Sequence, residues 1–196
     1  MAIRDLLYIC AECGREGGLK PAENGEVCDR CSTRYTRVDG ALIRCEPPGK
    51  PERTLHPSEW VDLLARSDGF EVPDRAEPVI LRTATTYRPL RIRGEYLGRV
   101  EQFGPPEEGT VELTPDALII RTADRTDHWR LTALTAVQPS STALQVKLRD
   151  GPLLSLKFPQ GSALLWEERL RACLQACYSR LGRGTIIEFQ PQILCR

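Results

Sequence analysis

The feature that most constrains the fold of this chain is a pair of Cys-x-x-Cys motifs near its N-terminus. The first is Cys10-Ala-Glu-Cys13, followed by Gly14, and the second is Cys28-Asp-Arg-Cys31. Each motif is a tight turn that aims two sulfur atoms at one point, and the fourteen residues between the motifs suffice for a hairpin that brings the turns together. The spacing therefore predicts a small ribbon in which Cys10, Cys13, Cys28 and Cys31 bind one metal ion.

Zinc is the expected ion, because it is the commonest occupant of a four-thiolate site, although iron fits the same cage. Four thiolates complete a tetrahedral shell and leave no position for a catalytic water, so one structural Zn²⁺ per chain is expected. The alternative for the same cysteines is two redox pairs. The first residues do not resemble a secretory signal, and no apolar stretch is long enough to cross a membrane, which places the chain in a reducing cytoplasm.

The residues after the second motif resemble a known class of zinc ribbons. Tyr35 is followed by Asp39, Gly40 and a hydrophobic residue, Ala41. This pattern is similar to the second half of methyltransferase-associated ribbons, which precede a methyltransferase or act as its small activating partner. The resemblance implies an enzyme-activating role. No glycine-rich cofactor-binding unit follows, so the chain is not expected to be the methyltransferase itself.

Composition divides the chain into four segments, and the expected fold class is α+β and mostly β. The predicted segments are a zinc ribbon (1–45), a Pro-rich connector with a short helix (46–78), a strand-rich domain ending in a helix (79–182) and a tail (183–196). Six prolines in the connector exclude a continuous helix or a central strand. Only Ser58–Ser67, directly after Pro57, is expected to be helical there.

The strand-rich segment alternates short β-branched runs with turn residues. Strands are expected at Glu95–Phe103, Thr110–Leu113, Ala117–Thr122, His128–Val137, Leu144–Leu148 and Leu153–Phe158, with a further strand-like run at 185–190 in the tail. A helix is expected to begin after the N-cap Ser162 and to end at Gly182, with Trp166 on its apolar face. Because a bent antiparallel sheet has an open end that one helix can cover, Trp166 is predicted to be a core residue.

Two resemblances concern this second half. The segment beginning Gly109-Thr-Val-Glu-Leu113-Thr and continuing to Leu118 resembles the opening of bacterial GRAM and pleckstrin-homology-like domains. That resemblance spans Glu95–Leu181 and implies an antiparallel barrel capped by the C-terminal helix. The segment from Leu131 to the tail, which ends in Gly184-Thr-Ile-Ile-Glu-Phe-Gln-Pro-Gln-Ile193, resembles regions attached to bacterial lysophospholipid acyltransferases, which implies a membrane-lipid setting. The His-x4-Asp motif of those enzymes is absent.

The sequence contains no recognisable catalytic constellation, so the chain is not expected to be an enzyme and no small-molecule substrate is identified. Its two histidines, His56 and His128, lie outside any catalytic motif. Cys173 and Cys177 are interpreted as buried small hydrophobes, and Cys45 as a core or surface residue without a catalytic partner. The pattern assigns no role to Cys195.

Charge suggests a local binding surface. The 27 basic and 27 acidic residues balance, which argues against a general attraction to nucleic acid. Between residues 82 and 99, however, five arginines and one glutamate give a local net charge of +4. These arginines, which can contact phosphate groups, are Arg82, Arg88, Arg91, Arg93 and Arg99. The alternative is a solvated strand face, or pairing with Glu107 and Glu108.

The function that the sequence favours is that of a non-catalytic, zinc-binding adaptor or regulatory protein. It is expected to bind a protein partner, an anionic membrane surface, or both, in the cytoplasm or at the membrane periphery. The alternative is an activating subunit of a methyltransferase or an acyltransferase. A nucleic-acid-binding ribbon is less favoured, because residues 1–40 carry six basic and seven acidic side chains.

Overall fold

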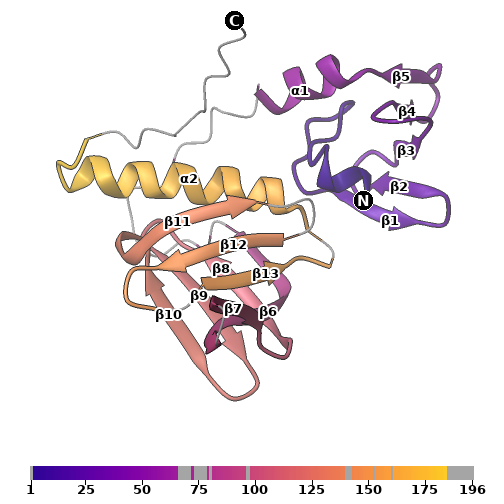
Figure 1. Cartoon of the computed structure of the whole chain (residues 1–196). Helices are drawn as coiled ribbons and strands as arrows, with labels where there is room; N and C mark the ends of the chain where they lie inside the picture. The colour runs from indigo at the N-terminus through magenta and orange to yellow at the C-terminus, as the bar shows by residue number, and fades with distance from the viewer. Residues whose placement is uncertain are drawn as a thin grey trace, which may run out of the picture.

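The computed structural model describes residues 2–65, 72, 79, 81–95, 98–139, 143–151, 153–159 and 161–184. The described chain is mostly β, as predicted, with antiparallel sheets and one long C-terminal helix. Figure 1 shows two β-rich modules, with helix α2 (Ala163–Arg180) lying across the sheet of the second and its N-terminal end directed at the first. Among the described residues, no helix is both long enough and apolar enough to span a membrane.

The first module begins with a short 3-10 helix, η1 (Ile3–Asp5), and continues as a five-stranded antiparallel meander. The strands neighbour one another in the order in which they occur along the chain. They are β1 (Leu19–Ala22), β2 (Gly25–Cys28), β3 (Arg34–Arg37), β4 (Ile43–Glu46) and β5 (Arg53–Leu55). Tyr35, Ile43 and Leu55 are fully buried between the sheet and the N-terminal segment. Removing these side chains from water stabilises the sheet, although a core this small contributes only a limited amount.

Part of the segment predicted to be a connector packs against this sheet. Strand β5 pairs with β4 at the sheet edge, where the neighbouring prolines do not interrupt a central ladder. Helix α1 (Pro57–Ala65) follows, close to the predicted range. The Trp60 indole donates a hydrogen bond to the Ala41 carbonyl oxygen at 3.2 Å, which ties α1 to the β3–β4 turn.

The second module is built on eight strands. They are β6 (Leu81–Glu95), β7 (Gly98–Phe103), β8 (Glu107–Leu113), β9 (Ala117–Thr122), β10 (Thr126–Arg130), β11 (Leu134–Pro139), β12 (Ala143–Leu148) and β13 (Leu153–Lys157). The spatial order is β10-β9-β8-β6-β13-β12-β11, and β7 pairs with the C-terminal part of β6. The described strands form an open path rather than a closed barrel.

Two strand predictions need correction. The predicted strand Glu95–Phe103 is instead the end of the long strand β6 followed by β7, with residues 96 and 97 outside the described chain. The predicted strand His128–Val137 is interrupted by a 3-10 turn, η3 (Leu131–Ala133), which separates β10 from β11. That turn places Leu131 and Leu134, three residues apart, in the same core, which a continuous strand would not do.

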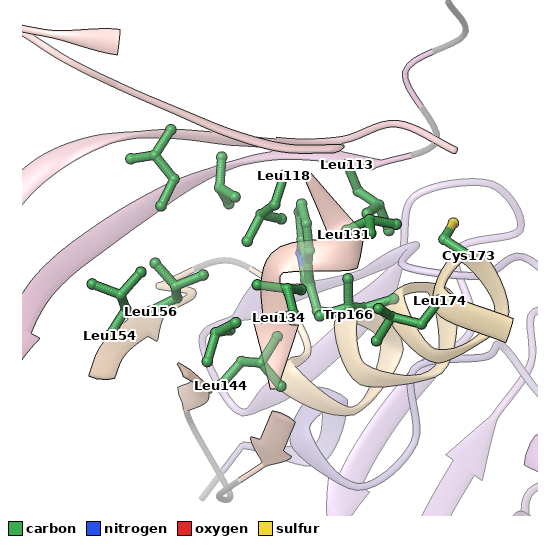
Figure 2. Close-up of a cluster of buried hydrophobic side chains, with 14 of the residues drawn as sticks. Leu113, Leu118, Leu131, Leu134, Leu144, Leu154, Leu156, Trp166, Cys173 and Leu174 are labelled. Atoms are coloured by element: carbon green, nitrogen blue, oxygen red, sulfur yellow. The ribbon is translucent and has the colours of Figure 1, made fainter. Parts of the chain in front are cut away.

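The core of the second module lies between its sheet and α2. Figure 2 shows Trp166 of α2 among Leu113, Leu118, Leu131 and Leu134. The Trp166 side chain is 2% exposed and stacks on Phe158, with ring centroids 5.2 Å apart. The core position predicted for Trp166 is therefore confirmed.

Both ends of α2 follow the predicted capping signals. The Ser162 hydroxyl accepts a hydrogen bond from the Leu165 amide at 3.3 Å, and this satisfies a free amide of the first turn. After Arg180, Gly182 adopts a left-handed conformation with φ of 64°, which a residue without a Cβ tolerates. The helix thus begins and ends where the sequence predicts. The strand-like tail segment at 185–190 lies outside the described residues.

Candidate metal centre

The four predicted ligands come together at one edge of the first module. The sulfur atoms of Cys10, Cys13, Cys28 and Cys31 all lie within 4.8 Å of one another. The Cys10–Cys31 pair is separated by 3.5 Å and the Cys13–Cys28 pair by 3.6 Å. A tetrahedral ion with bonds of about 2.3 Å to sulfur requires sulfur–sulfur distances of about 3.8 Å. The cluster therefore has the donor set and the size to hold a metal ion.

Each Cys-x-x-Cys motif forms the same kind of turn. The Gly14 amide donates to the Cys10 carbonyl at 2.9 Å, and the Ser32 amide donates to the Cys28 carbonyl at 3.0 Å. The residue that closes each turn has a positive φ, 68° at Gly14 and 59° at Ser32. Glycine adopts this conformation freely, whereas serine does so at a cost. The second turn therefore holds a strained residue that the surrounding hydrogen bonds must stabilise.

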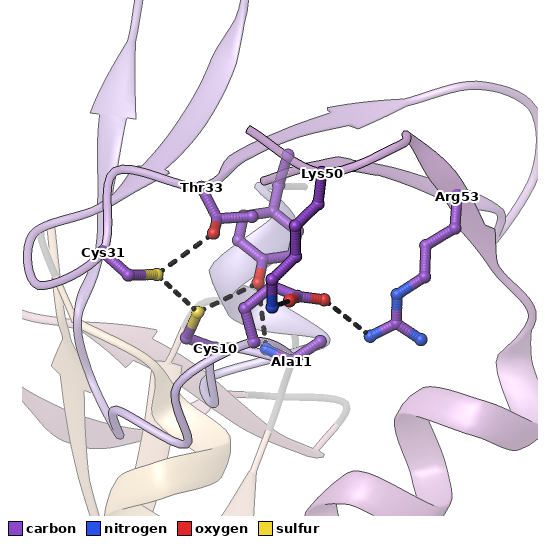
Figure 3. A network of polar contacts seen from close by, with 8 residues as sticks. Cys10, Ala11, Cys31, Thr33, Lys50 and Arg53 are labelled. Atoms are coloured by element: carbon purple, nitrogen blue, oxygen red, sulfur yellow. Dashed lines mark hydrogen bonds and ion pairs between the residues drawn. The ribbon is translucent and has the colours of Figure 1, made fainter. Parts of the chain in front are cut away.

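Two hydroxyl groups lie against the sulfur atoms (Figure 3). The Tyr35 hydroxyl is 3.1 Å from the Cys10 sulfur and accepts a hydrogen bond from the Ala11 amide at 2.9 Å. Because its oxygen already accepts, the hydroxyl proton is free to point at the Cys10 sulfur. The Thr33 hydroxyl is 3.1 Å from the Cys31 sulfur. Such donors orient ligating sulfurs and stabilise their ionised form.

Burial and hydrogen bonds shift the pKa values of three of the four thiols in opposite directions. Burial raises the pKa of Cys10, and burial raises the pKa of Cys13 to about 12. Burial also opposes ionisation of Cys31, but hydrogen bonds from Thr33, together with those from Cys10 and Cys13, outweigh it and lower the pKa of Cys31 to about 6. Without a cation, the cluster does not carry four thiolates at neutral pH. A metal ion that binds there must therefore displace protons.

Ion pairs attach the first motif to its surroundings. Glu12, between the first two cysteines, contacts Lys50 Nζ and Arg53 Nη2, each at 3.0 Å. The hydrogen bond from Lys50 is the largest effect lowering the pKa of Glu12, with a further contribution from Arg53. These contacts connect the motif to Lys50 in the loop between β4 and β5 and to Arg53 at the start of β5, and Figure 3 shows Lys50 and Arg53 in the same network view as Cys10 and Cys31. The predicted connector thus helps to position the candidate metal site.

Within the described chain, the other cysteines and the two histidines do not join the cluster. Cys45 is fully buried in β4, in register with Tyr35, and burial raises its pKa. Cys173 and Cys177 are buried in the second core, as predicted, and the Cys177 thiol donates to the Pro115 carbonyl at 3.1 Å. His56 precedes α1 and His128 lies in β10, both exposed. Cys195 lies outside the described residues.

The backbone places the predicted arginine cluster on two neighbouring strands. Arg82, Arg88, Arg91 and Arg93 belong to β6, and Arg99 belongs to β7. In the β6–β7 register, Gly94 is opposite Arg99, and Arg93 is the neighbouring position on β6. Glu107, one of the acidic residues considered as partners, pairs with Arg125 at 3.1 Å. The cluster lies apart from the cysteine site in sequence and belongs to the other module.

A contact between the modules escaped the sequence analysis. Arg169 of α2, only 5% exposed, forms an ion pair with Glu16, three residues after Cys13. Beside it, Leu165 packs against Tyr8 and Ile9. The sequence offers one indication of this contact: Arg169, a basic residue, lies within the apolar stripe of the helix, three residues after Trp166. Its partner lies 153 residues earlier, where no local pattern points to it.

We expect Glu16→Gln to weaken the contact between the modules. The substitution removes the carboxylate charge that Glu16 places against the buried Arg169 guanidinium. The expected loss of unfolding free energy is about 2 kcal/mol, below the range for fully buried pairs because the Glu16 side chain is 37% exposed. Urea unfolding monitored by circular dichroism measures this loss. Glu168→Gln removes a partly exposed pair with Arg171 and is the control, with an expected loss below about 0.5 kcal/mol. Equal losses of unfolding free energy in the two variants would contradict a stabilising role for the Glu16–Arg169 ion pair.

Comparison with known proteins does not extend these assignments. No family model matches the chain, and no curated protein matches it. Among solved structures, it is similar to the C-terminal domain of an unknown protein from Leishmania infantum. That similarity has 15% sequence identity, covers 58% of this chain and 98% of the other, and has a TM-score of 0.37. A TM-score of this size does not establish a shared fold, so the ribbon, GRAM or pleckstrin-homology-like and acyltransferase-associated resemblances stay predictions.

Proposed function

We propose that this chain is a non-catalytic adaptor whose first module is a ribbon held by one structural Zn²⁺. The observation that carries the proposal is the four-sulfur cage. Cys10, Cys13, Cys28 and Cys31 would hold the ion, which would neutralise the thiolates and cross-link the two turns. With four thiolates bound, a zinc ion has no open position for water or substrate, so its contribution is to folding.

The second module is proposed to be a pleckstrin-homology-like binding domain. Its support is the open path of antiparallel strands, with the first strand β6 in the middle and a single C-terminal helix against the core. The ion pair between Glu16 and Arg169 joins this domain to the ribbon. A protein of this design presents two modules in a fixed arrangement to its partners.

The proposed partner is an anionic surface, either of a membrane or of a protein, that contacts the arginine cluster of β6 and β7. Each basic residue near an anionic bilayer contributes about 1 kcal/mol, so a few of them give weak and reversible association. The attraction should decrease with added salt, because the Debye length falls to about 8 Å at physiological ionic strength. An activating role toward a methyltransferase or an acyltransferase is a form of the same proposal, with the enzyme as the protein partner.

Co-sedimentation with vesicles tests the membrane form of the proposal. The full chain should sediment with anionic vesicles and not with neutral ones, and Arg88/Arg91/Arg93→Glu should abolish this binding. The matched control is Arg34/Arg37/Arg44→Glu, which reverses three exposed charges in the first module and should retain binding. If wild type and both variants bind anionic vesicles equally, the cluster is not the contact surface. Negligible binding by all proteins would remove the membrane and leave only a protein partner.

A further inference from the structure

Arginines in the second module divide into two groups according to their partners. Eight arginines lie between residues 104 and 184. The side chains of six of them have partners. Arg121, Arg125, Arg169 and Arg171 form ion pairs, Arg180 donates a hydrogen bond to the Pro115 carbonyl, and Arg183 lies over the Tyr178 ring. Arg130 and Arg149 have no side-chain hydrogen bond or ion pair to any described residue. Both are exposed.

These two arginines line the same cavity. It has a volume of about 560 Å³ and lies at the corner where β10 passes through η3 into β11, facing the turn between β12 and β13. Its lining residues are His128, Trp129, Arg130, Thr132, Ala133, Leu148, Arg149, Asp150 and Gly151. Pockets that bind small ligands have volumes of about 300–1,000 Å³. The cavity is therefore large enough for one small molecule or one long side chain.

The lining combines an apolar part with a cationic rim. Leu148 is 9% exposed, and both Leu148 and the half-buried Trp129 belong to or pack against the core of the module. The exposed residues His128, Arg130, Arg149 and Asp150 form the polar part. Two guanidinium groups against one carboxylate leave the rim with a net charge of +1 when His128 is neutral.

The backbone keeps the corner in place independently of any ligand. The Arg149 amide donates to the Ala133 carbonyl at 2.9 Å, which joins the β12–β13 turn to η3. Lys147 Nζ donates to the Gly151 carbonyl at 2.7 Å within the same turn. The Leu131 amide donates to the Asp116 carbonyl at 2.8 Å and anchors the start of η3. The segments that carry Arg130 and Arg149 are thus fixed relative to each other.

We propose that this cavity binds an acid group, a carboxylate or a phosphate, carried on an apolar or aromatic body. The planar guanidinium presents paired donors that match the oxygens of such a group, and Trp129 with Leu148 supplies apolar surface for the body. Two sources have this chemistry, a free small acid and an acidic side chain of a bound polypeptide. The proposal goes beyond the adaptor function, because the cavity involves neither the cysteine cage nor the β6–β7 arginines.

Calorimetric titration of the full chain with phenyl phosphate tests the site. We expect saturable binding in the millimolar range or tighter, with much weaker binding of inorganic phosphate and of benzyl alcohol, which lack the ring and the charge respectively. Arg130→Gln and Arg149→Gln should each weaken binding about tenfold or more, since each removes a charge-assisted contact. Both residues are exposed, so the variants should retain the wild-type melting temperature. Arg171→Gln, an exposed arginine of α2 outside the cavity, is the matched control and should bind normally.

The titration also distinguishes the two sources. Tighter binding of a blocked peptide that carries one glutamate next to a phenylalanine, lost in the same two variants, would assign the cavity to a polypeptide. Tighter binding of phenyl phosphate than of the peptide would assign it to a free acid. An unchanged dissociation constant in the Arg130→Gln/Arg149→Gln double variant, or no saturable binding of either probe by the wild type, would overturn the proposal.

Discussion

Cys28→Ser is expected to remove the metal ion and unfold the first module. The serine hydroxyl does not ionise near neutral pH and is a poor ligand for a soft site, so the four-thiolate shell is opened. Zinc binding contributes about 10–16 kcal/mol to the folding of small zinc-dependent domains, whereas the whole stability of a domain is about 5–15 kcal/mol. A five-stranded sheet with a small core is therefore not expected to stay folded once the ion is lost.

Elemental analysis and amide-proton NMR of the full chain check this result. The wild type should contain one zinc ion per chain, and Cys28→Ser should contain little or none after dialysis against a chelator. The matched control is Cys45→Ser, which also replaces a fully buried cysteine of the same core, but one outside the four-sulfur cluster. That variant should lose stability and keep its zinc. A metal-free wild-type chain with a folded first module would contradict the structural role of the ion.

The effect of metal loss should extend beyond the first module. Glu16 lies three residues after Cys13, the second cysteine of the first motif, and its carboxylate is the ion-pair partner of Arg169. If the first module unfolds, Arg169 loses this partner and Leu165 loses its contacts with Tyr8 and Ile9. The second module of Cys28→Ser should therefore melt at a lower temperature than that of the wild type, although none of its own residues has changed.

Local chemistry explains what the sequence predicts correctly. The cysteine motifs are predictable because tight turns and ligand spacing are encoded in a few adjacent residues. Helix α2 is predictable because its cap Ser162, its apolar stripe and its terminal Gly182 all indicate the same boundaries. Strand β9 is predicted to the residue, since a short apolar run is bounded by turn residues at both ends.

The features that the sequence does not predict depend on contacts between residues far apart in the chain. Strand β6 escapes prediction because its sequence is rich in threonine and arginine and contains Pro89, which argues against a central strand. In the structure the partners of β6 change near this proline: pairing with β8 ends at Tyr87, and pairing with β7 begins at Leu90. The missing amide of Pro89 therefore falls where one ladder ends and another begins. The same holds for the ion pair between Glu16 and Arg169 and for the cavity beside β10. Each brings together residues that share no local sequence pattern.

Trp166→Ala is expected to destabilise the second module by about 3–5 kcal/mol, the range for removing a large buried aromatic side chain. The indole is 2% exposed, stacks on Phe158 and lies among leucines from β8, β9, η3 and β11. Its removal leaves a cavity among closely packed side chains from several elements, so the loss should approach the upper end of the range. Urea unfolding followed by far-ultraviolet circular dichroism gives the free energy.

Trp60→Ala is the matched control for this experiment, because it removes the same side chain from a half-buried site in α1. That variant should weaken the first module and leave the unfolding of the second nearly unchanged. Trp166→Ala should show the reverse and retain one zinc ion per chain, since the cysteine cage lies in the other module. If Trp166→Ala unfolds at the wild-type urea concentration, the indole does not fill the core, and the apolar face of α2 would have to be a docking surface instead.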